Sequence, residues 1–263
     1  MPHFKIEETN IYYEDQGKGE PLLLIAGLNC DSRVWTLVLD ELKKSYRVIF
    51  FDNRGVGQSD SIHSPITIET MAHDAFNLLN FLNISKATVI GHSMGGTIAQ
   101  TMAYLHPQRI NKLIICNSLV KVSRVNRLLG ALLFTLRSCG INPQRLLKRA
   151  VPFLFAKEFR KNKEQMQEIT QGFLGKSQHP QSFLNYRRQL EALLSFNSRS
   201  WLHQIQSPTL IISGKEDRLC SSDSKLLARY ISQSKLISLS QVGHVPMLEK
   251  PHIFVQTVKD FMD

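Results

Sequence analysis

The apolar positions of this chain alternate between short continuous runs and longer runs with helical spacing. Continuous apolar runs predict strands that are buried on both faces of a sheet. They occupy residues 21–27, 46–52, 87–93 and 110–118. Residues 33–45, 67–83 and 94–107 lie between them and carry apolar residues at helical spacing. This alternation predicts a mostly parallel sheet with helices on both faces.

Two segments depart from the alternation. Residues 4–15 read as a hairpin of two short strands turning around Thr9 and Asn10. From Leu119 the strands stop, and four helical segments follow: 122–137, 143–157, 158–174 and 181–196. The strand pattern returns at 207–217. We therefore predict an eight-stranded core made of 1–118 and 201–263, with residues 119–200 inserted after the sixth strand as a helical cap.

Length and composition are typical of a soluble globular protein, which we expect to be cytoplasmic. The 263 residues are 43% hydrophobic, and no run approaches the roughly 20 apolar residues that span a bilayer. The first 15 residues lack the pattern of a secretion signal. The four cysteines are widely spaced. We expect them to be reduced thiols in the cytoplasm.

The net charge of +10 is concentrated in the predicted cap. Residues 119–200 hold 15 Lys or Arg and 4 Asp or Glu, and the rest of the chain is almost neutral. These cations are either solvated helix faces or a docking surface for an acidic carrier protein. No interleaving of aromatic and basic residues indicates nucleic-acid binding. The apolar segment 128–138 is explained by a lid over the substrate or by contact with a membrane surface, without stable insertion.

The sequence from Gly91 to Gly95 has the form G-x-S-x-G, with Ser93 at its centre. It lies between a predicted strand and a predicted helix, which is the context expected for a nucleophile on a tight turn. Side chains two residues before and after such a turn would collide, so glycine is needed there. We therefore predict that Ser93 is a catalytic nucleophile.

A serine nucleophile requires a base, and the base requires an anion. His244 follows the last predicted strand in a loop after a glycine, and it is the predicted base among nine histidines. Asp217 follows the strand at 209–214 and is the predicted acid, with the adjacent Glu216 as the alternative. The order Ser93, Asp217, His244 is that of α/β-hydrolases.

The chain resembles the α/β-hydrolase superfamily over essentially its full length. Four separate motifs carry the resemblance: IAGLNCDSRVW (25–35), FDNRGVGQSD (51–60), GHSMGG (91–96) and GHVPMLEKP (243–251). The resemblance implies an oxyanion hole formed by the backbone amides of Leu28 and Met94. Ala26 replaces a histidine that is common in the family, which leaves the backbone role of Leu28 intact. It implies no cofactor and no metal.

Other residues of these motifs receive structural or open interpretations. We interpret Asp52 and Arg54 as structural residues of a tight turn beneath the active site. His92 adjoins Ser93 and is expected to support the turn. Asn29 and Trp35 are candidates for substrate contact, although the helical spacing of Trp35 favours a core position.

These residues predict a serine hydrolase that cleaves carboxylic esters through an acyl-enzyme. Similar enzymes include carboxylesterases, enol-lactone hydrolases, C–C hydrolases, perhydrolases and the methyl-ester esterase of pimeloyl carrier protein. Esters, thioesters on a carrier, lactones and C–C bonds therefore remain open as substrates. A non-catalytic ligand binder of the same fold is a further alternative.

Overall fold

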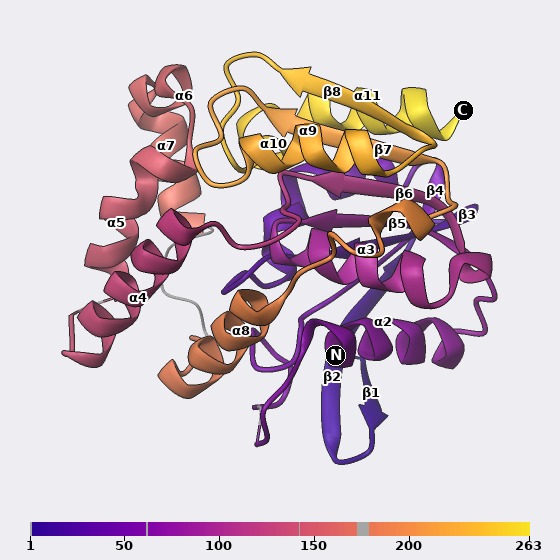
Figure 1. The fold of residues 1–263 in the computed structure, drawn as a ribbon, viewed down its shortest axis with the longest axis horizontal. Helices are drawn as coiled ribbons and strands as arrows, with labels where there is room; N and C mark the ends of the chain where they lie inside the picture. Colours follow the sequence, from indigo (N-terminus) through magenta and orange to yellow (C-terminus); the bar gives the residue numbers. More distant parts are fainter. Residues whose placement is uncertain (1, 62, 142, 173–178) are drawn as a thin grey trace.

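The computed structural model describes residues 2–61, 63–141, 143–172 and 179–263. Its centre is an eight-stranded sheet in the order β1-β2-β4-β3-β5-β6-β7-β8 (Figure 1). The strands are β1 (His3–Ile6), β2 (Thr9–Gln16), β3 (Glu20–Ile25), β4 (Tyr46–Phe51), β5 (Ala87–His92), β6 (Ile110–Cys116), β7 (Thr209–Gly214) and β8 (Ser234–Leu239). Strands β3 to β8 pair in parallel, whereas β2 is antiparallel to both β1 and β4.

The hairpin at the start of the chain turns earlier than predicted. Ile6 pairs with Thr9, so the turn consists of Glu7 and Glu8 rather than Thr9 and Asn10. Glu7 has a φ of 52°, the left-handed conformation that two-residue hairpin turns need. The sequence predicted the wrong turn because Glu7 and Glu8 are not the glycine or asparagine residues that usually mark a two-residue hairpin turn.

Alternate residues of the buried strands face two separate hydrophobic cores. Leu23 and Ile25 of β3 pack on the side that is covered by α2 (Ile68–Phe81), α3 (Met94–Leu105) and α9 (Ser221–Tyr230). Leu22 and Leu24 pack on the side covered by α1 (Thr36–Leu42), α10 (Pro246–Glu249) and α11 (Pro251–Met262). Both faces of the sheet are therefore apolar, which explains the continuous apolar runs in the sequence.

The insertion between β6 and β7 contains five helices among the described residues. They are α4 (Arg124–Ser138), α5 (Pro143–Leu154), α6 (Lys157–Lys161), α7 (Lys163–Gly172) and α8 (Phe183–Ser195). Figure 1 shows them to one side of the sheet. No helix of the described ranges is long and apolar enough to cross a membrane.

The single helix predicted over 158–174 is wrong, because the chain breaks at Asn162. This residue has extended backbone torsions (φ −77°, ψ 93°) between α6 and α7. Its side-chain oxygen accepts a hydrogen bond from the amide of Gln165 at 3.1 Å. Asparagine competes with the helical backbone in this way and is favoured at helix starts. Residues 173 and 174 of that prediction lie outside the described residues.

Substitution of Phe254 tests how much the core beneath α11 contributes to stability. It is fully buried, and its ring centroid lies 6.4 Å from that of Trp35. Phe254→Ala should lower the free energy of unfolding by about 3–5 kcal/mol, because it removes an aromatic ring from a packed interior. Leu37→Ala, at a leucine of α1 that is 45% exposed, should change it by about 0.5 kcal/mol or less. Urea unfolding of both variants measures the difference; equal losses would contradict the core assignment.

Candidate active site

Ser93 is the turn residue between β5 and α3. Its torsions are φ 54° and ψ −117°, a conformation that L-residues rarely adopt. The neighbouring glycines make the turn possible. A Cβ on Gly91 would lie 2.2 Å from the carbonyl oxygen of Gly95, and a Cβ on Gly95 would lie 2.1 Å from that of Ile25. Ser93 is partly exposed, whereas the residues on either side of it are buried.

The backbone of Ser93 is fixed to the end of the neighbouring strand. Its amide donates to the carbonyl of Cys116, the last residue of β6, at 3.0 Å. Its carbonyl accepts a hydrogen bond from the hydroxyl of Ser118 at 2.7 Å and another from the amide of Gly96 at 3.0 Å. The turn is thus held by both the following helix and the adjacent strand, which over-determines its strained torsions.

The loop after β3 reaches the same turn. A Cβ on Gly27 would lie 3.1 Å from the Cβ of Ser93, so a larger residue there would push the two segments apart by a few tenths of an ångström. Leu28 follows Gly27, and Met94 is the first residue of α3, where amides have no acceptor within the helix. Both amides that were predicted for an oxyanion hole therefore belong to residues next to this contact.

Residues of the motif that begins at Phe51 form hydrogen bonds with the loop after β3. Asp52 is buried, and its carboxylate accepts the amides of Ser32 at 2.7 Å and Gln58 at 2.8 Å. The side chain of Asn53 donates to the carbonyl of Ala26 at 3.1 Å. Arg54 pairs with the buried Asp74 of α2. These contacts are structural ones, as the sequence analysis expected for Asp52 and Arg54.

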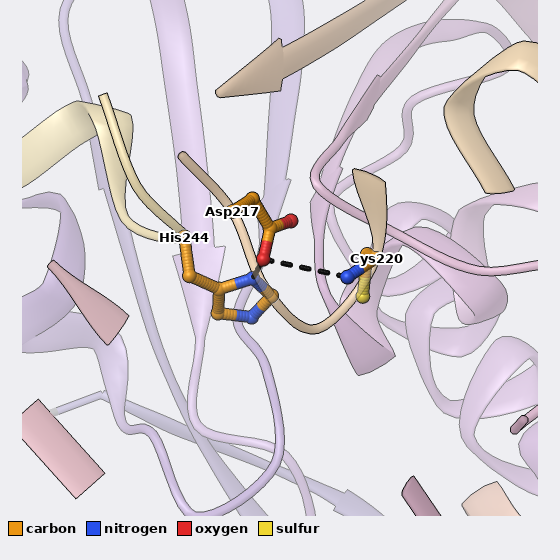
Figure 2. Close-up of side chains that lie close together, drawn as sticks. All are labelled: Asp217, Cys220 and His244. Atoms are coloured by element: carbon orange, nitrogen blue, oxygen red, sulfur yellow. Dashed lines mark hydrogen bonds and ion pairs between the residues drawn. The ribbon is translucent and has the colours of Figure 1, made fainter. Parts of the chain in front are cut away.

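Asp217 and His244 meet at the ends of β7 and β8 (Figure 2). Asp217 Oδ1 lies 3.1 Å from His244 Nδ1, and both residues are buried, at 3% and 4% exposure. The same oxygen accepts the amides of Leu219 at 2.8 Å and Cys220 at 3.3 Å. Burial alone would raise the pKa of Asp217, but the His244 charge and these donors hold the pKa below its ordinary value. The carboxylate is therefore ionised at neutral pH and can stabilise a charged imidazole.

The alternative acid, Glu216, faces elsewhere. Its side-chain oxygen accepts the amide of Lys157, at the start of α6, at 2.7 Å. It therefore connects the β7 loop to the insertion, while the neighbouring Asp217 faces the histidine.

The main chain of His244 is anchored at both ends of its peptide unit. Its amide donates to the carbonyl of Leu154, in the insertion, at 2.7 Å. Its carbonyl accepts the side-chain amide of Asn117 at 2.8 Å and faces His92 Nε2 at 2.8 Å. His92, the residue before Ser93, thus supports the histidine loop through its side chain. Asn117, which follows β6, also accepts the amide of Gly214 at 2.8 Å.

Glu249 holds the same loop, and sequence reasoning gave it no role. Its buried carboxylate accepts the amides of Gly243 at 3.0 Å and Val245 at 3.2 Å, on either side of His244. It also accepts the amide of Ala156, in the insertion, at 2.8 Å. Burial raises the pKa of Glu249, against the effect of these donors. The only sequence signal was its place in the motif at 243–251.

Asp217, Cys220 and His244 also form a group whose potential ligand atoms lie within 4.8 Å of one another. Burial raises the pKa of the Cys220 thiol well above its ordinary value, so the sulfur keeps its proton, whereas metals bind the thiolate. His244 Nδ1 already faces Asp217. Among the described residues this group is therefore better suited to proton transfer than to metal binding.

The two candidates for substrate contact lie in different environments. Asn29 is exposed, with a φ of 59°, and its amide donates to Gln189 of α8 at 3.4 Å. Gln189 is fully buried and donates to the carbonyl of Arg54 at 3.0 Å, so it joins the insertion to both loops. Trp35 is fully buried against Phe254, which is the core position that its spacing favoured.

A serine on a strained strand-to-helix turn and a buried carboxylate–histidine pair, both at the same edge of a parallel sheet, are features of the hydrolase class of α/β proteins. The family model of the alpha/beta hydrolase fold matches residues 20–251. The chain therefore belongs to the alpha/beta hydrolase fold family.

Individual relatives cover almost the whole chain. The 3-oxoadipate enol-lactonase 2 of Acinetobacter baylyi is 27% identical over 99% of this chain and 97% of its own length. RutD of Azorhizobium caulinodans, a provisional carbamate hydrolase, is 28% identical over 99% and 98%. The structure of a thermophilic esterase from Thermogutta terrifontis is 27% identical, covers 97% of this chain and 93% of its own, and has a TM-score of 0.84.

His92 makes folding stability depend on pH. Complete burial, followed by the neighbouring His244 charge, lowers the pKa of His92 to about 3. Because the folded pKa lies below the unfolded value of about 6.5, this contribution is full above pH 6.5 and is lost as the pH falls toward 3. His92→Gln should reduce the slope of unfolding free energy against pH between 6 and 4 by up to about 1.4 kcal/mol per unit.

Denaturant unfolding at several pH values measures this slope. His252→Gln, at an exposed position of α11, is the matched control and should retain the wild-type slope. An unchanged slope in His92→Gln would show that His92 takes up no proton on unfolding.

Glu249→Gln tests the support of the histidine loop. The amide keeps one acceptor oxygen but turns an NH₂ donor toward backbone donors, which should destabilise the fold by about 1–3 kcal/mol. Hydrolytic kcat should fall more than KM changes, because the base is displaced while the rest of the site remains. Glu41→Gln, an exposed carboxylate that pairs with Lys259, is the control. Wild-type kcat in Glu249→Gln would contradict a role for this carboxylate in holding His244.

Proposed function

We propose that this protein is a serine hydrolase that cleaves carboxylic esters through an acyl-enzyme intermediate. The observation that carries the proposal is the strained Ser93 turn at the edge of the sheet where Asp217 and His244 form a buried pair. Esterases among the solved structures, at 27% and 25% identity, support the substrate class.

In this mechanism Ser93 attacks the ester carbonyl while His244 takes the hydroxyl proton. Asp217 stays ionised, holds the imidazole through Nδ1 and stabilises its positive charge. The amides of Leu28 and Met94 stabilise the oxyanion, and the dipole of α3 adds to this effect. His244 then protonates the leaving alcohol, and it later activates the water that releases the acid. In this proposal residues 119–200 are the cap that selects the substrate.

A lactone is the second candidate substrate. It is a cyclic ester, so the same steps would open it, and the enol-lactonase relative matches nearly the whole chain. The cation-rich insertion supports a third form of the substrate, an acyl group on an acidic carrier protein. All three share the acyl-Ser93 intermediate and differ only in the leaving group.

Ser93→Ala tests the mechanism on p-nitrophenyl esters with acyl chains of two to sixteen carbons. The variant should lose turnover on the order of a million-fold, because the three residues act as a unit. Ser222→Ala, at an exposed serine of α9, should hydrolyse at the wild-type rate. A fluorophosphonate should label the wild type and fail to label Ser93→Ala, which reports the nucleophile without any assumption about substrate.

Retention of most activity in Ser93→Ala would refute the nucleophile. Labelling at Ser93 without hydrolysis of any simple ester would keep the mechanism and move the substrate to a lactone or a carrier-bound acyl group. The absence of both labelling and hydrolysis in a folded protein would favour a non-catalytic binder.

A further inference from the structure

Helix α4 packs against the rest of the insertion through one face. Phe134 lies 5.0 Å from Phe183 of α8 between ring centroids, and a Cβ on Gly130 would lie 3.7 Å from Leu190. Arg127 donates to the carbonyl of Leu194. These contacts place the inner face of α4 along α8.

The opposite face of α4 is apolar and exposed. Val125 and Leu128 are each 73% exposed, and Leu132 is 54% exposed. At 3.6 residues per turn, these three positions form one stripe, roughly half a turn away from Gly130 and Phe134. Large aliphatic side chains lined up on one exposed helix face are typical of a surface that contacts another apolar phase. We call Val125, Leu128 and Leu132 the outer stripe.

The charged residues of α4 and α5 have a single sign. No Asp or Glu occurs in residues 75–157. Helices α4 and α5 carry six cationic residues: Arg124, Arg127, Arg137, Arg145, Lys148 and Arg149. Those whose side chains are described, Arg124, Arg127, Arg145 and Arg149, are all exposed.

The exposed aliphatic side chains and the cationic residues together indicate which kind of partner binds this face. A second copy of the chain would bring an equally cationic helix against this one, and like charges oppose that contact. An anionic lipid surface offers both of the properties needed: acidic headgroups for the arginines and an acyl layer for the aliphatic stripe. Helix α4 has 15 residues, fewer than the roughly 20 that span a bilayer, so such a helix lies in the plane of the interface.

We propose that the outer face of α4 binds the surface of anionic phospholipid membranes, with the outer stripe in the acyl boundary and the exposed Arg124, Arg145 and Arg149 at the headgroups. This surface is separate from Ser93, Asp217 and His244, and the proposal holds whatever ester or other substrate the site accepts.

Vesicle co-sedimentation tests the proposal on the full chain. At physiological ionic strength the protein should pellet with vesicles of phosphatidylcholine containing 30% phosphatidylglycerol and remain in solution with phosphatidylcholine alone. The double variant Leu128→Gln/Leu132→Gln should bind about tenfold or more weakly, because it removes two aliphatic groups from the interface. Arg145→Gln/Arg149→Gln should also bind about tenfold more weakly, because each cation contributes near an anionic surface.

Matched controls separate the stripe from general surface effects. Leu37→Gln changes a leucine of α1 that is 45% exposed, and it should bind vesicles like the wild type. Far-ultraviolet circular dichroism and the midpoint of thermal unfolding should match the wild type in every variant.

Three results would overturn the proposal. The first is a wild type that fails to pellet with the anionic vesicles. The second is Leu128→Gln/Leu132→Gln that pellets as well as the wild type, which would reduce the effect to net charge. The third is a stripe-dependent interaction with a different partner without vesicle binding: either self-association seen by sedimentation velocity, or binding of an acidic acyl carrier protein used as a probe.

Discussion

The close approach of three backbone segments at Ser93 is the constraint on which the rest of the site depends. The turn brings α3 to within contact of the ends of β3 and β6, and any side chain at Gly91 or Gly95 would overlap main-chain oxygens. Because the sheet is parallel through β3, β5, β6, β7 and β8, the loops after these strands all reach the same edge. Ser93 and His244, which are far apart in the chain, therefore lie in loops at the same edge of the sheet.

Hydrogen bonds from side chains to the main chain hold the histidine loop in place. Asn117, His92 and Glu249 use side-chain groups to satisfy backbone amides and carbonyls around His244. A buried peptide group without a partner is costly, so such a loop has few alternative conformations. The donors and acceptors come from β5, the loop after β6, α10 and the insertion, so residues along the whole sheet edge determine the position of the base.

The sequence predicted those features that are local or periodic. The parallel sheet, its fold class and the insertion after the sixth strand followed from continuous apolar runs, and the Ser93 turn followed from five consecutive residues. Contacts over long separations left no such pattern. Glu249 meets Ala156 across 93 positions, and Gln189 lies within an ordinary helical segment. The break at Asn162 was missed because helical spacing continues through it, and the early hairpin turn was missed because Glu7 is an unusual residue for a left-handed torsion.

The hydrogen bonds between the insertion and the histidine loop limit where the insertion can be exchanged with that of a relative. Leu154 offers its carbonyl and Ala156 its amide, so these contacts need a particular backbone path but no particular side chains. These two hydrogen bonds can therefore persist when the side chains of α5 and α6 change, provided that the backbone between the two helices keeps its course. A chimeric protein that keeps residues 154–156 and takes its other insertion helices from a relative would retain the hydrogen bonds to His244 and Glu249. A chimera whose junction falls within residues 154–156 would lose them, and its insertion would no longer be held against the histidine loop.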